Sequence, residues 1–527
     1  MSGGVCRAAS ISLTGLDGTA VMVEAAVTNQ LPGMAIIGLP DTAVAEAKQR
    51  VRLATQQAGF ALSDRFLLVN LSPAALPKQG SGFDLAIALA ALAASGQLPA
   101  DALPGIAHLG ELSLDGGLRR PPGLLSAVLA ARRLGFERVM VPESAVGEAA
   151  LVPGMEVIAV ADLRGAVIWH RGGSEGWRIA QYSEGVVSNH PGGTVTGGRI
   201  GAESELTPDI SDIVGQPEAV EALTVAAAGR HHLSMIGPPG AGKTLLATRL
   251  PTILPDLTPD ESIVVSSIVS LGGMALTELV RRPPFESPHH TASKVSIIGG
   301  GDSSEVRPGA VTRATHGVLF LDEAPEFPRS VLDALRQPLE SGEVEVHRAR
   351  IHATLPAQVQ LVLAANPCPC GNADVLDAAE PCRCSPNTRI RYLGRISGPL
   401  NDRIDLRLTV RRVSSVLEIA DERVRPTSLE LRRLVAAARE RAAERLRGTP
   451  WRVNAEVPGP WLRSSIAKLP RADTAVLDQA LSRGSLTVRG YDRTLRVGWT
   501  LADLAGKERP GRAELAHALA LRGGAAL

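Results

Sequence analysis

The chain reads Gly237-Pro238-Pro239-Gly240-Ala241-Gly242-Lys243-Thr244 between two apolar runs, Leu233 to Ile236 and Leu245 to Ala247. This order predicts a strand, a glycine-rich loop and a helix. The pattern G-x-x-x-x-G-K-[ST] is that of a P-loop, in which backbone N–H groups surround phosphates. Lys243 would neutralise the β- and γ-phosphates, and Thr244 would offer its hydroxyl to Mg²⁺. We therefore expect ATP and Mg²⁺ to bind at residues 237–244 of an α/β fold.

Length and composition narrow the class of protein. At 527 residues the chain is long enough for about two to four domains. Its 55 Lys and Arg balance 54 Asp and Glu, so a nucleic-acid surface would have to be a local patch. The start has no secretory pattern, no apolar run reaches membrane-spanning length, and five cysteines do not make a secreted disulfide framework. We expect a cytoplasmic protein with no membrane partner.

Residues 1–171 form a first block, which mixes short strands with helices, such as an expected helix at 42–59. Its landmarks resemble the ribosomal-S5-like α+β domain of Lon proteases. In that family the loop P-K-D-G-P-S-A-G carries a nucleophilic serine, and a later G-G-x-K segment carries the lysine that activates it. The corresponding stretch here is Leu76-Pro77-Lys78-Gln79-Gly80-Ser81-Gly82-Phe83-Asp84.

The residues that carry the catalytic chemistry of the Lon motif are missing from this sequence. The serine position falls on Gly82 and the lysine position near Leu125, and neither residue can supply a nucleophile or a base. Ser81 and Lys78 lie close by in the sequence but out of register. We expect a Lon-like fold that is not an active protease and has a structural or gating role.

A glycine-rich stretch, residues 172–206, has little apolar periodicity and is expected to be a linker. A second block, residues 207–412, contains the P-loop. Further along it, the apolar run Gly317 to Leu321 ends in Asp322-Glu323. This is a Walker B pattern, in which Asp322 would hold Mg²⁺ through water and Glu323 would polarise the attacking water. Acidic residues also end apolar strands at ordinary helix starts, but the P-loop upstream favours the Walker B interpretation.

A polar residue also ends the next apolar strand. The run Val359 to Ala365 is followed by Asn366, which occupies the sensor 1 position of ring ATPases, where the amide contacts the water and the γ-phosphate. The alternative is a turn or helix-capping asparagine, since Pro367 follows. In ring ATPases a segment like Asp212 to Gln216 packs on the adenine.

Two arginines resemble residues of ring ATPases related to magnesium chelatase and the MCM helicases. In that group the arginine of a D-R-[FI]-D segment, here Arg403, projects into the ATP of the neighbouring subunit. The alternative is a surface ion pair of Arg403 with Asp402 or Asp405. An arginine in the lid contacts the γ-phosphate as sensor 2, and the resemblance places it at Arg489. Two later arginines in the same helix are weaker candidates for this role, Arg493 and Arg496.

The last blocks are expected to be a helical lid, residues 413–510, and a partly disordered tail, residues 511–527. The lid helix at 429–446 is rich in Ala, Arg and Glu, and its arginines are expected on a solvated face. Between Asn366 and Arg403 lie two C-x-C pairs, which could supply four thiolates to a structural Zn²⁺; the alternative is free thiols. These are Cys368, Cys370, Cys382 and Cys384.

Several stretches together are similar to the YifB/ComM family of magnesium-chelatase-like AAA+ ATPases. They are Pro284 to Ser293 with His289-His290, Ile298 to Gly301, Leu335 to Glu340 and Asn366 to Gly371. The resemblance implies an α/β multidomain chain: a Lon-like α+β domain, a P-loop αβα core with a parallel sheet, and a helical lid. It also implies a homo-hexameric ring that drives DNA branch migration in recombination.

The resemblance leaves alternatives open. Glu286 stands where the family typically has arginine, and an acid in a pore loop would weaken phosphate attraction. Asn401 replaces a typical leucine. His289 and His290 could be a metal pair, a motor insert at the pore or neighbour, or ordinary turn histidines. The alternative function is a chelatase-type motor that remodels a partner protein for metal insertion.

Overall fold

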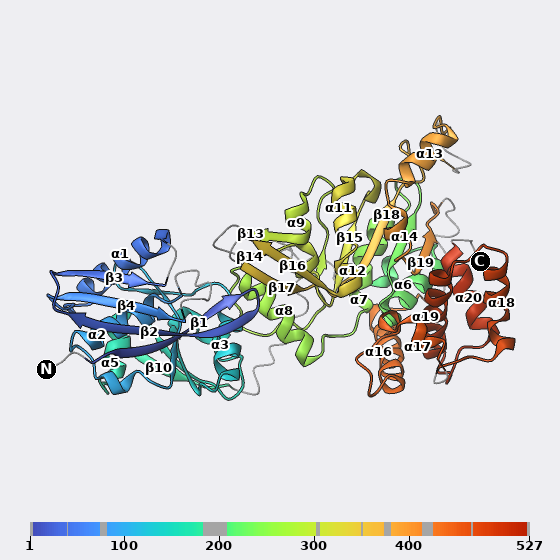
Figure 1. The fold of residues 1–527 in the computed structure, drawn as a ribbon. Helices are drawn as coiled ribbons and strands as arrows, with labels where there is room; N and C mark the ends of the chain where they lie inside the picture. Colours follow the sequence, from blue (N-terminus) through green and yellow to red (C-terminus); the bar gives the residue numbers. More distant parts are fainter. Residues whose placement is uncertain are drawn as a thin grey trace.

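The computed structural model describes residues 4–38, 41–73, 82–182, 208–301, 306–348, 351–373, 381–413, 425–464 and 467–523. Figure 1 shows an elongated molecule, with a sheet-containing N-terminal unit at one end, a second sheet near the middle and a group of helices at the other end. The mixed α/β architecture with a separate parallel sheet and a helical C-terminal region confirms the predicted fold class. Within the described residues, no helix is long and apolar enough to cross a membrane.

The N-terminal unit is built on a mixed eight-stranded sheet. Strand β4 alternates between half-buried and buried residues, as expected for a strand with one face on the core. The apolar helix α2, Asp84–Ala94, is buried from Asp84 to Ala93 because it packs against β1 and β2. The strand order is β10 (Trp177–Ala180), β9 (Glu156–Val160), β8 (Arg138–Pro142), β5 (Ile106–His108), β1 (Cys6–Thr14), β2 (Asp17–Thr28), β4 (Phe66–Ser72) and β3 (Gly33–Ile37).

Two sequence-based expectations for this unit can be compared with the structure: the linker from residue 172 and the positions of the Lon motif. Strand β10 pairs with β9 in antiparallel fashion, so the sheet extends into the stretch expected to be a linker from residue 172. A Cβ built on Gly82 would stand 3.5 Å from the Cβ of Pro121, and the side chain of Leu125 is buried. Lys78 and Ser81 lie outside the described residues. The helices of the unit are α1 (Asp41–Gln57), α3 (Leu124–Arg133), α4 (Val146–Ala149) and α5 (Leu163–His170).

The central unit contains a five-stranded, fully parallel sheet. Strands β15 and β18 are buried on both faces, which explains why they read as continuous apolar runs in the sequence. In a parallel sheet the carboxyl ends of the strands meet at one edge, and ligands bind there. The order is β12 (Phe285–Glu286), β15 (Val318–Leu321), β18 (Gln360–Ala365), β11 (Leu233–Ile236) and β19 (Leu406–Thr409).

Helices and two hairpins surround this sheet. Helix α8, Pro259–Leu271, begins with a capping box of Thr258 and Glu261, and its far end contacts helix α3 of the N-terminal unit. The hairpins are β13 (Gly299–Gly301) with β14 (Val306–Pro308) and β16 (Glu343–Arg348) with β17 (Ile351–Pro356). The other helices are α6 (Pro217–Gly229), α7 (Lys243–Ile253), α9 (Lys294–Ile298), α10 (Ala310–Arg313), α11 (Arg329–Ala334), α12 (Pro338–Ser341), α13 (Pro386–Leu393) and α14 (Gly398–Asn401).

The C-terminal helices, which the sequence predicts to be a lid and which are called the lid here, have their own apolar core. The expected tail is instead helix α20, Arg512–Gly523, which packs on α19 and buries Leu515 and Ala518. The disorder expected there is wrong for the described part, because these apolar residues recur at helical spacing and fill the space beside α19. The remaining helices are α16 (Ser428–Arg445), α17 (Gly459–Leu462), α18 (Arg471–Ser482) and α19 (Val488–Leu504).

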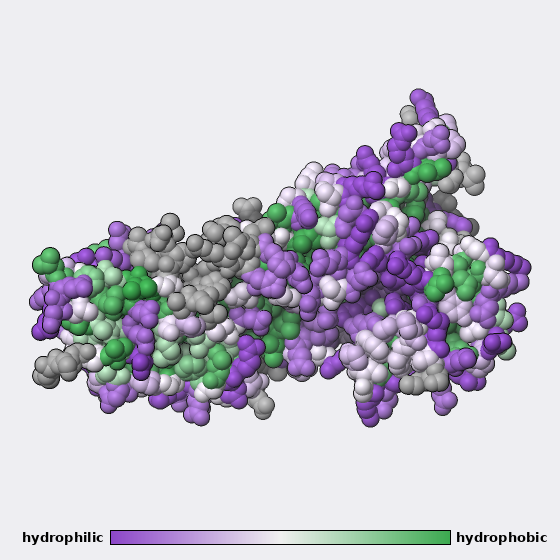
Figure 2. Space-filling view, in the orientation of Figure 1, coloured by the Kyte–Doolittle hydropathy of each residue, from purple (hydrophilic) through white to green (hydrophobic). Residues whose placement is uncertain are grey.

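Three arginines of α16 are bonded to other helices, although Arg433 and Arg441 are exposed as expected for a solvated face. Arg432 donates to Thr252 O near the end of α7, Arg439 to Ala227 O near the end of α6, and Arg441 to Asp503 O near the end of α19. Each guanidinium therefore caps the carbonyls of another helix, where a cation is favoured. Figure 2 shows hydrophilic side chains covering much of the surface around the central sheet and the lid.

Candidate nucleotide site

The P-loop lies between β11 and α7, as its sequence predicts. Gly240 and Gly242 have φ angles of +76° and +88°, which only glycine adopts without strain. A Cβ at Gly237 would stand 2.3 Å from the carbonyl oxygen of Val410, so the strand on that side fixes the start of the loop. The first turn of α7 begins at Lys243, so its free N–H groups point into the loop.

Lys243 is held inside the loop. Its ammonium donates to the carbonyls of Gly237 at 2.7 Å and Pro238 at 2.9 Å, and to Oδ1 of Asn366 at 3.1 Å. Burial lowers the pKa of Lys243, while Asp322 and Glu323 oppose this shift. The predicted lysine and the predicted sensor asparagine are therefore in direct contact at the same edge of the sheet.

The residues expected to hold Mg²⁺ also meet. The hydroxyl of Thr244 donates to Oδ2 of Asp322 at 2.7 Å, and the backbone N–H of Glu323 donates to Oδ1 of the same aspartate at 2.9 Å. A hydroxyl and a carboxylate are oxygen ligands of the kind that Mg²⁺ prefers. The Thr244 hydroxyl and the Asp322 carboxylate both lie at the mouth of the P-loop. Their oxygen atoms fit a Mg²⁺ ion at this place.

Glu323 follows directly and has a left-handed backbone, with φ of +51°. Its Oε2 lies 3.2 Å from Nδ1 of His290, a residue on the segment between β12 and α9. The sequence singled out His289-His290 without linking it to Glu323. The contact was hidden because the two residues lie on different segments that only the fold brings together.

The segment expected to pack on the adenine lines a pocket near the P-loop. This pocket has a volume of about 930 Å³, and its lining includes Ile213, Gly215 and Gln216 from that segment and Leu501 from the lid. The Gln216 amide donates to Ala241 O at 2.9 Å, so the segment is joined to the P-loop itself. Residues of both the central unit and the C-terminal helices therefore line the pocket.

The two predicted arginines lie apart from this cluster. Arg403 donates to Pro399 O at 2.7 Å and pairs with Glu340 at 2.5 Å, not with Asp402 or Asp405. Arg489 is exposed in the first turn of α19 and makes no hydrogen bond or ion pair within the part of the chain described. Among the described residues of the single chain, neither arginine is hydrogen-bonded to or paired with a residue of the P-loop.

A buried network ties the segment of Arg403 to the lid, and sequence reasoning missed it. Asp405 is fully buried, pairs with Arg493 of α19 at 2.6 Å and lies 3.6 Å from Nδ1 of His231. Burial alone would raise the pKa of Asp405, but Arg493 and His231 hold it well below its usual value. Arg493, a weaker sensor candidate, is thus engaged. The only signal in the sequence was the second acid of the D-R-I-D segment.

The four clustered cysteines come together although they span two segments. Sγ of Cys368 lies 3.3 Å from that of Cys370 and 3.7 Å from that of Cys382, and all four sulfurs including Cys384 lie within 4.8 Å of one another. A tetrahedron with Zn–S bonds of about 2.3 Å separates its sulfurs by about 3.8 Å, so the set fits zinc. Part of the expected Gly371–Glu380 loop lies outside the described residues.

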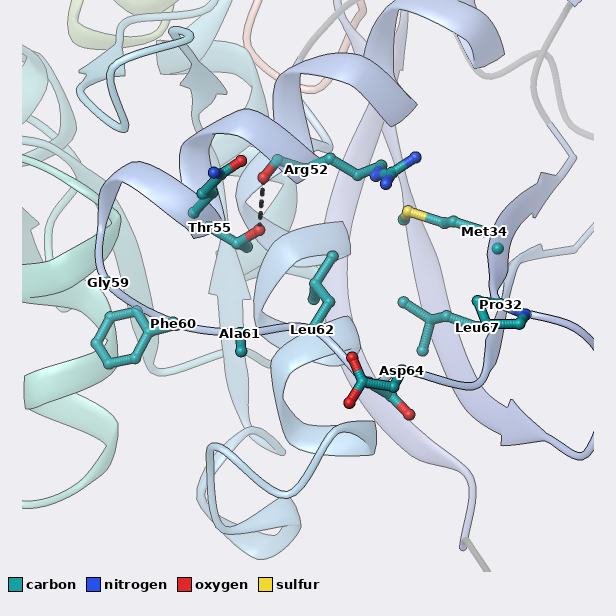
Figure 3. A pocket seen from close by; sticks show the side chains of 13 residues that line it. Pro32, Met34, Arg52, Thr55, Gly59, Phe60, Ala61, Leu62, Asp64 and Leu67 are labelled. Atoms are coloured by element: carbon teal, nitrogen blue, oxygen red, sulfur yellow. Dashed lines mark hydrogen bonds between the residues drawn. The ribbon is translucent and has the colours of Figure 1, made fainter.

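A second pocket, of about 640 Å³, lies in the N-terminal unit (Figure 3). It is formed by the end of α1, the loop after it and strands β3 and β4, with Met34, Arg52 and Asp64 in its lining. The hydroxyl of Thr55 in this pocket donates to the carbonyls of Val51 and Arg52, so the helix backbone engages it. Thr55 is therefore not available in this pocket as a nucleophile activated by a base.

Comparison with known proteins gives matches along most of the chain. Three family models describe subunit ChlI of magnesium chelatase and match residues 23–145, 209–417 and 425–522, the last as its C-terminal part. An uncharacterised protein of Mycobacterium tuberculosis is 47% identical over 98% of both chains. Competence protein ComM of Haemophilus influenzae is 39% identical over 96% of this chain and 95% of its own. YifB of Escherichia coli, itself uncharacterised, is 37% identical over the same shares.

Proposed function

Because the chain belongs to the YifB/ComM family of magnesium-chelatase-like proteins, we propose that it is a ring-forming ATPase which couples ATP hydrolysis to movement along DNA. The ring would be a homo-hexamer, and the process recombination or DNA uptake. The observation that carries the ATPase part is the cluster at the edge of the parallel sheet. There Lys243 contacts Asn366, and Thr244 contacts Asp322.

Each residue of this cluster has a role in the proposal. The backbone N–H groups of residues 237–242 and the ammonium of Lys243 bind the phosphates. Thr244 and Asp322 would hold the Mg²⁺ that accompanies the nucleotide, and the bound ion would supply positive charge to offset that of the β- and γ-phosphates. Glu323 orients the attacking water, and Asn366 senses the γ-phosphate. The domain limits given by the sequence, 1–171, 172–206, 207–412 and 413–510, belong to the same proposal, with the lid continuing through α20.

A ring is proposed because the chain supplies an incomplete site. Arg403 lies away from the P-loop of its own subunit, on a segment that Asp405 anchors to the lid. A finger arginine stabilises the charge on the transferring phosphoryl group when it comes from a neighbour. Arg489 is exposed and would serve as sensor 2 at the same interface.

The DNA part of the proposal rests on the relative named as a competence protein. The structure bears on one doubt raised by the sequence. Glu286 lies in strand β12, paired to β15, and its carboxylate is bonded to Arg313 at 2.9 Å. Its charge is therefore balanced by a neighbour within the chain and does not oppose phosphate binding as a free acid would.

The test measures ATPase activity with no DNA, with single-stranded DNA and with forked DNA. We expect DNA to raise the turnover rate, and Lys243→Ala to abolish hydrolysis because the phosphates lose their main cation. Ring assembly in ATP, followed by light scattering, should accompany activity. If neither DNA raises the rate although hydrolysis occurs, the DNA part is wrong and the ATPase part stands.

The second candidate is a chelatase-type motor that remodels a partner protein for metal insertion. The three family models described for the ChlI subunit favour it. The same assay separates the two functions, since a chelatase-type motor would be stimulated by a protein partner and not by DNA. Co-purification of a metal-inserting partner with the Glu323→Gln variant, which keeps the phosphate-binding residues and lacks the group assigned to orient water, would support this candidate.

A further inference from the structure

We propose that His290 is the positioning residue of Glu323, the residue assigned to orient the attacking water. The inference rests on the proposed ATPase function and adds to it a residue outside the P-loop, Walker B and sensor positions. It starts from one contact: Nδ1 of His290 lies 3.2 Å from Oε2 of Glu323. In the tautomer that carries hydrogen on Nδ1, the imidazole donates to the carboxylate.

Glu323 needs an external partner to fix its carboxylate. It is the residue after strand β15 and has a left-handed backbone, which turns its side chain away from the direction that the strand would give. Its own neighbour Asp322 is already engaged by Thr244. Its side chain is about half exposed, so packing alone does not fix it, and the contact with His290 restricts where the carboxylate can point.

His290 is itself held from two sides. Its ring lies 4.1 Å from the ring of His289 and meets the ring of Phe327 edge-on at 6.5 Å. His289 is fixed in turn by Thr291, whose hydroxyl lies 2.9 Å from Nδ1 of His289. A catalytic base that is oriented by a second group, itself held in place, is the arrangement by which enzymes fix a proton acceptor.

Of the alternatives given for the His pair, the structure supports a turn, where the N–H of Ala292 donates to His289 O. His289 and His290 lie at a turn, and His290 faces the hydrolytic glutamate. The segment that carries them follows β12, the edge strand whose Glu286 is bonded to Arg313. The position of Glu323 therefore depends on a part of the chain that lies far from both the P-loop and the Walker B strand in sequence.

The test compares three variants in the full-length protein without DNA. We expect His290→Ala to lower kcat by roughly 10- to 100-fold, with KM for ATP changed less than about twofold, because misplacing a catalytic group costs rate and not nucleotide affinity. His290→Asn should recover most of the rate, since its amide nitrogen stands as many bonds from the backbone as Nδ1. His290→Gln, whose nitrogen lies one bond further out, should recover less.

Controls separate this inference from the function on which it rests. His352→Ala, an exposed histidine on β17, should keep the wild-type rate, and circular dichroism should show that every variant is folded. Equal loss in His290→Ala and His290→Asn, an unchanged kcat in His290→Ala, or a rise in KM alone would each overturn the inference while wild-type hydrolysis stands. A wild-type protein without any ATPase activity would overturn the proposed function and this inference together.

Discussion

At the scale of single residues, Arg403 gives the sharpest prediction about sharing of the site. In the single chain it is tied to Glu340, whose carboxylate is mostly exposed, and does not reach the P-loop cluster. If Arg403 acts in the neighbouring subunit, Arg403→Ala should lower kcat by roughly 1,000-fold, as loss of an arginine finger does. Mixing it with inactive Lys243→Ala should restore activity, since an intact P-loop then meets an intact finger.

The matched control for this mixing experiment is Glu340→Gln. It frees Arg403 from its ion pair without removing the guanidinium, and exposed ion pairs contribute little to stability. We expect its ATPase rate to stay within about twofold of the wild type. If the mixture of the two inactive variants shows only the sum of their separate rates, Arg403 does not act across subunits.

The same residues show what a sequence can and cannot reveal. Lys243 and Asp322 were predictable because strand, loop and side-chain chemistry are written in consecutive residues. Their contacts follow from a general property of parallel sheets, whose carboxyl ends meet. His290 and Asp405 could not be assigned, because each acts through a partner on another segment. Their partners become visible only when the segment after β12 is placed beside the end of β15, and α19 beside the start of β19.

At the scale of elements, the sequence predicted the bounds of an amphipathic helix well and the partners of its charged side chains poorly. Helix α16 was expected at 429–446 and lies at Ser428–Arg445. Its arginines were expected in solvent because nothing in the sequence shows that three other helices end beside them. Helix α20 was expected to be a tail for a related reason. Its apolar face is short, and the sequence does not show that this face packs against α19.

The cysteine-bearing segment carries a prediction at this scale. The Asn372 backbone and the Cys368 thiol lower the pKa of Cys370 to about 6, while burial raises the pKa of Cys368, so Cys370 is the thiol that most readily becomes a thiolate. We propose that the four thiols hold one structural Zn²⁺, and expect about one zinc per chain by elemental analysis. The double variant Cys370→Ser/Cys384→Ser should lose the metal and a few degrees of melting temperature.

Replacement of the remaining thiol, Cys6→Ser, provides the control for the zinc measurement. Cys6 is buried in the N-terminal sheet, far along the chain from the cluster, and should not change the zinc content. Full-length wild-type protein that contains no zinc after purification without chelator, and takes up none when it is added, would show that the cluster is a set of free thiols.

At the scale of the whole molecule, one buried network joins the N-terminal unit to the central unit. The hydroxyl of Ser270, at the end of α8, donates to Glu148 at 2.5 Å, and Arg120 pairs with the same carboxylate at 2.5 Å. The Gly123 N–H donates to Ser270 O at 2.9 Å. Helix α8 begins in the central unit and ends on α3, so this contact places the two units relative to each other.

Removing the hydroxyl of Ser270 should loosen that connection. Glu148 is 1% exposed, and a buried carboxylate that loses a donor costs about 1–3 kcal/mol. Ser270→Ala should therefore speed hydrogen exchange in residues 123–128, where α3 meets α8, while leaving the P-loop segment unchanged. The matched control is Ser262→Ala in the same helix, whose buried hydroxyl donates to Val280 O inside the central unit. It should change exchange near Val280 and not in α3. Equal exchange of residues 123–128 in wild type and Ser270→Ala would mean that the apolar contacts of α3 and α8 hold the units together without this network.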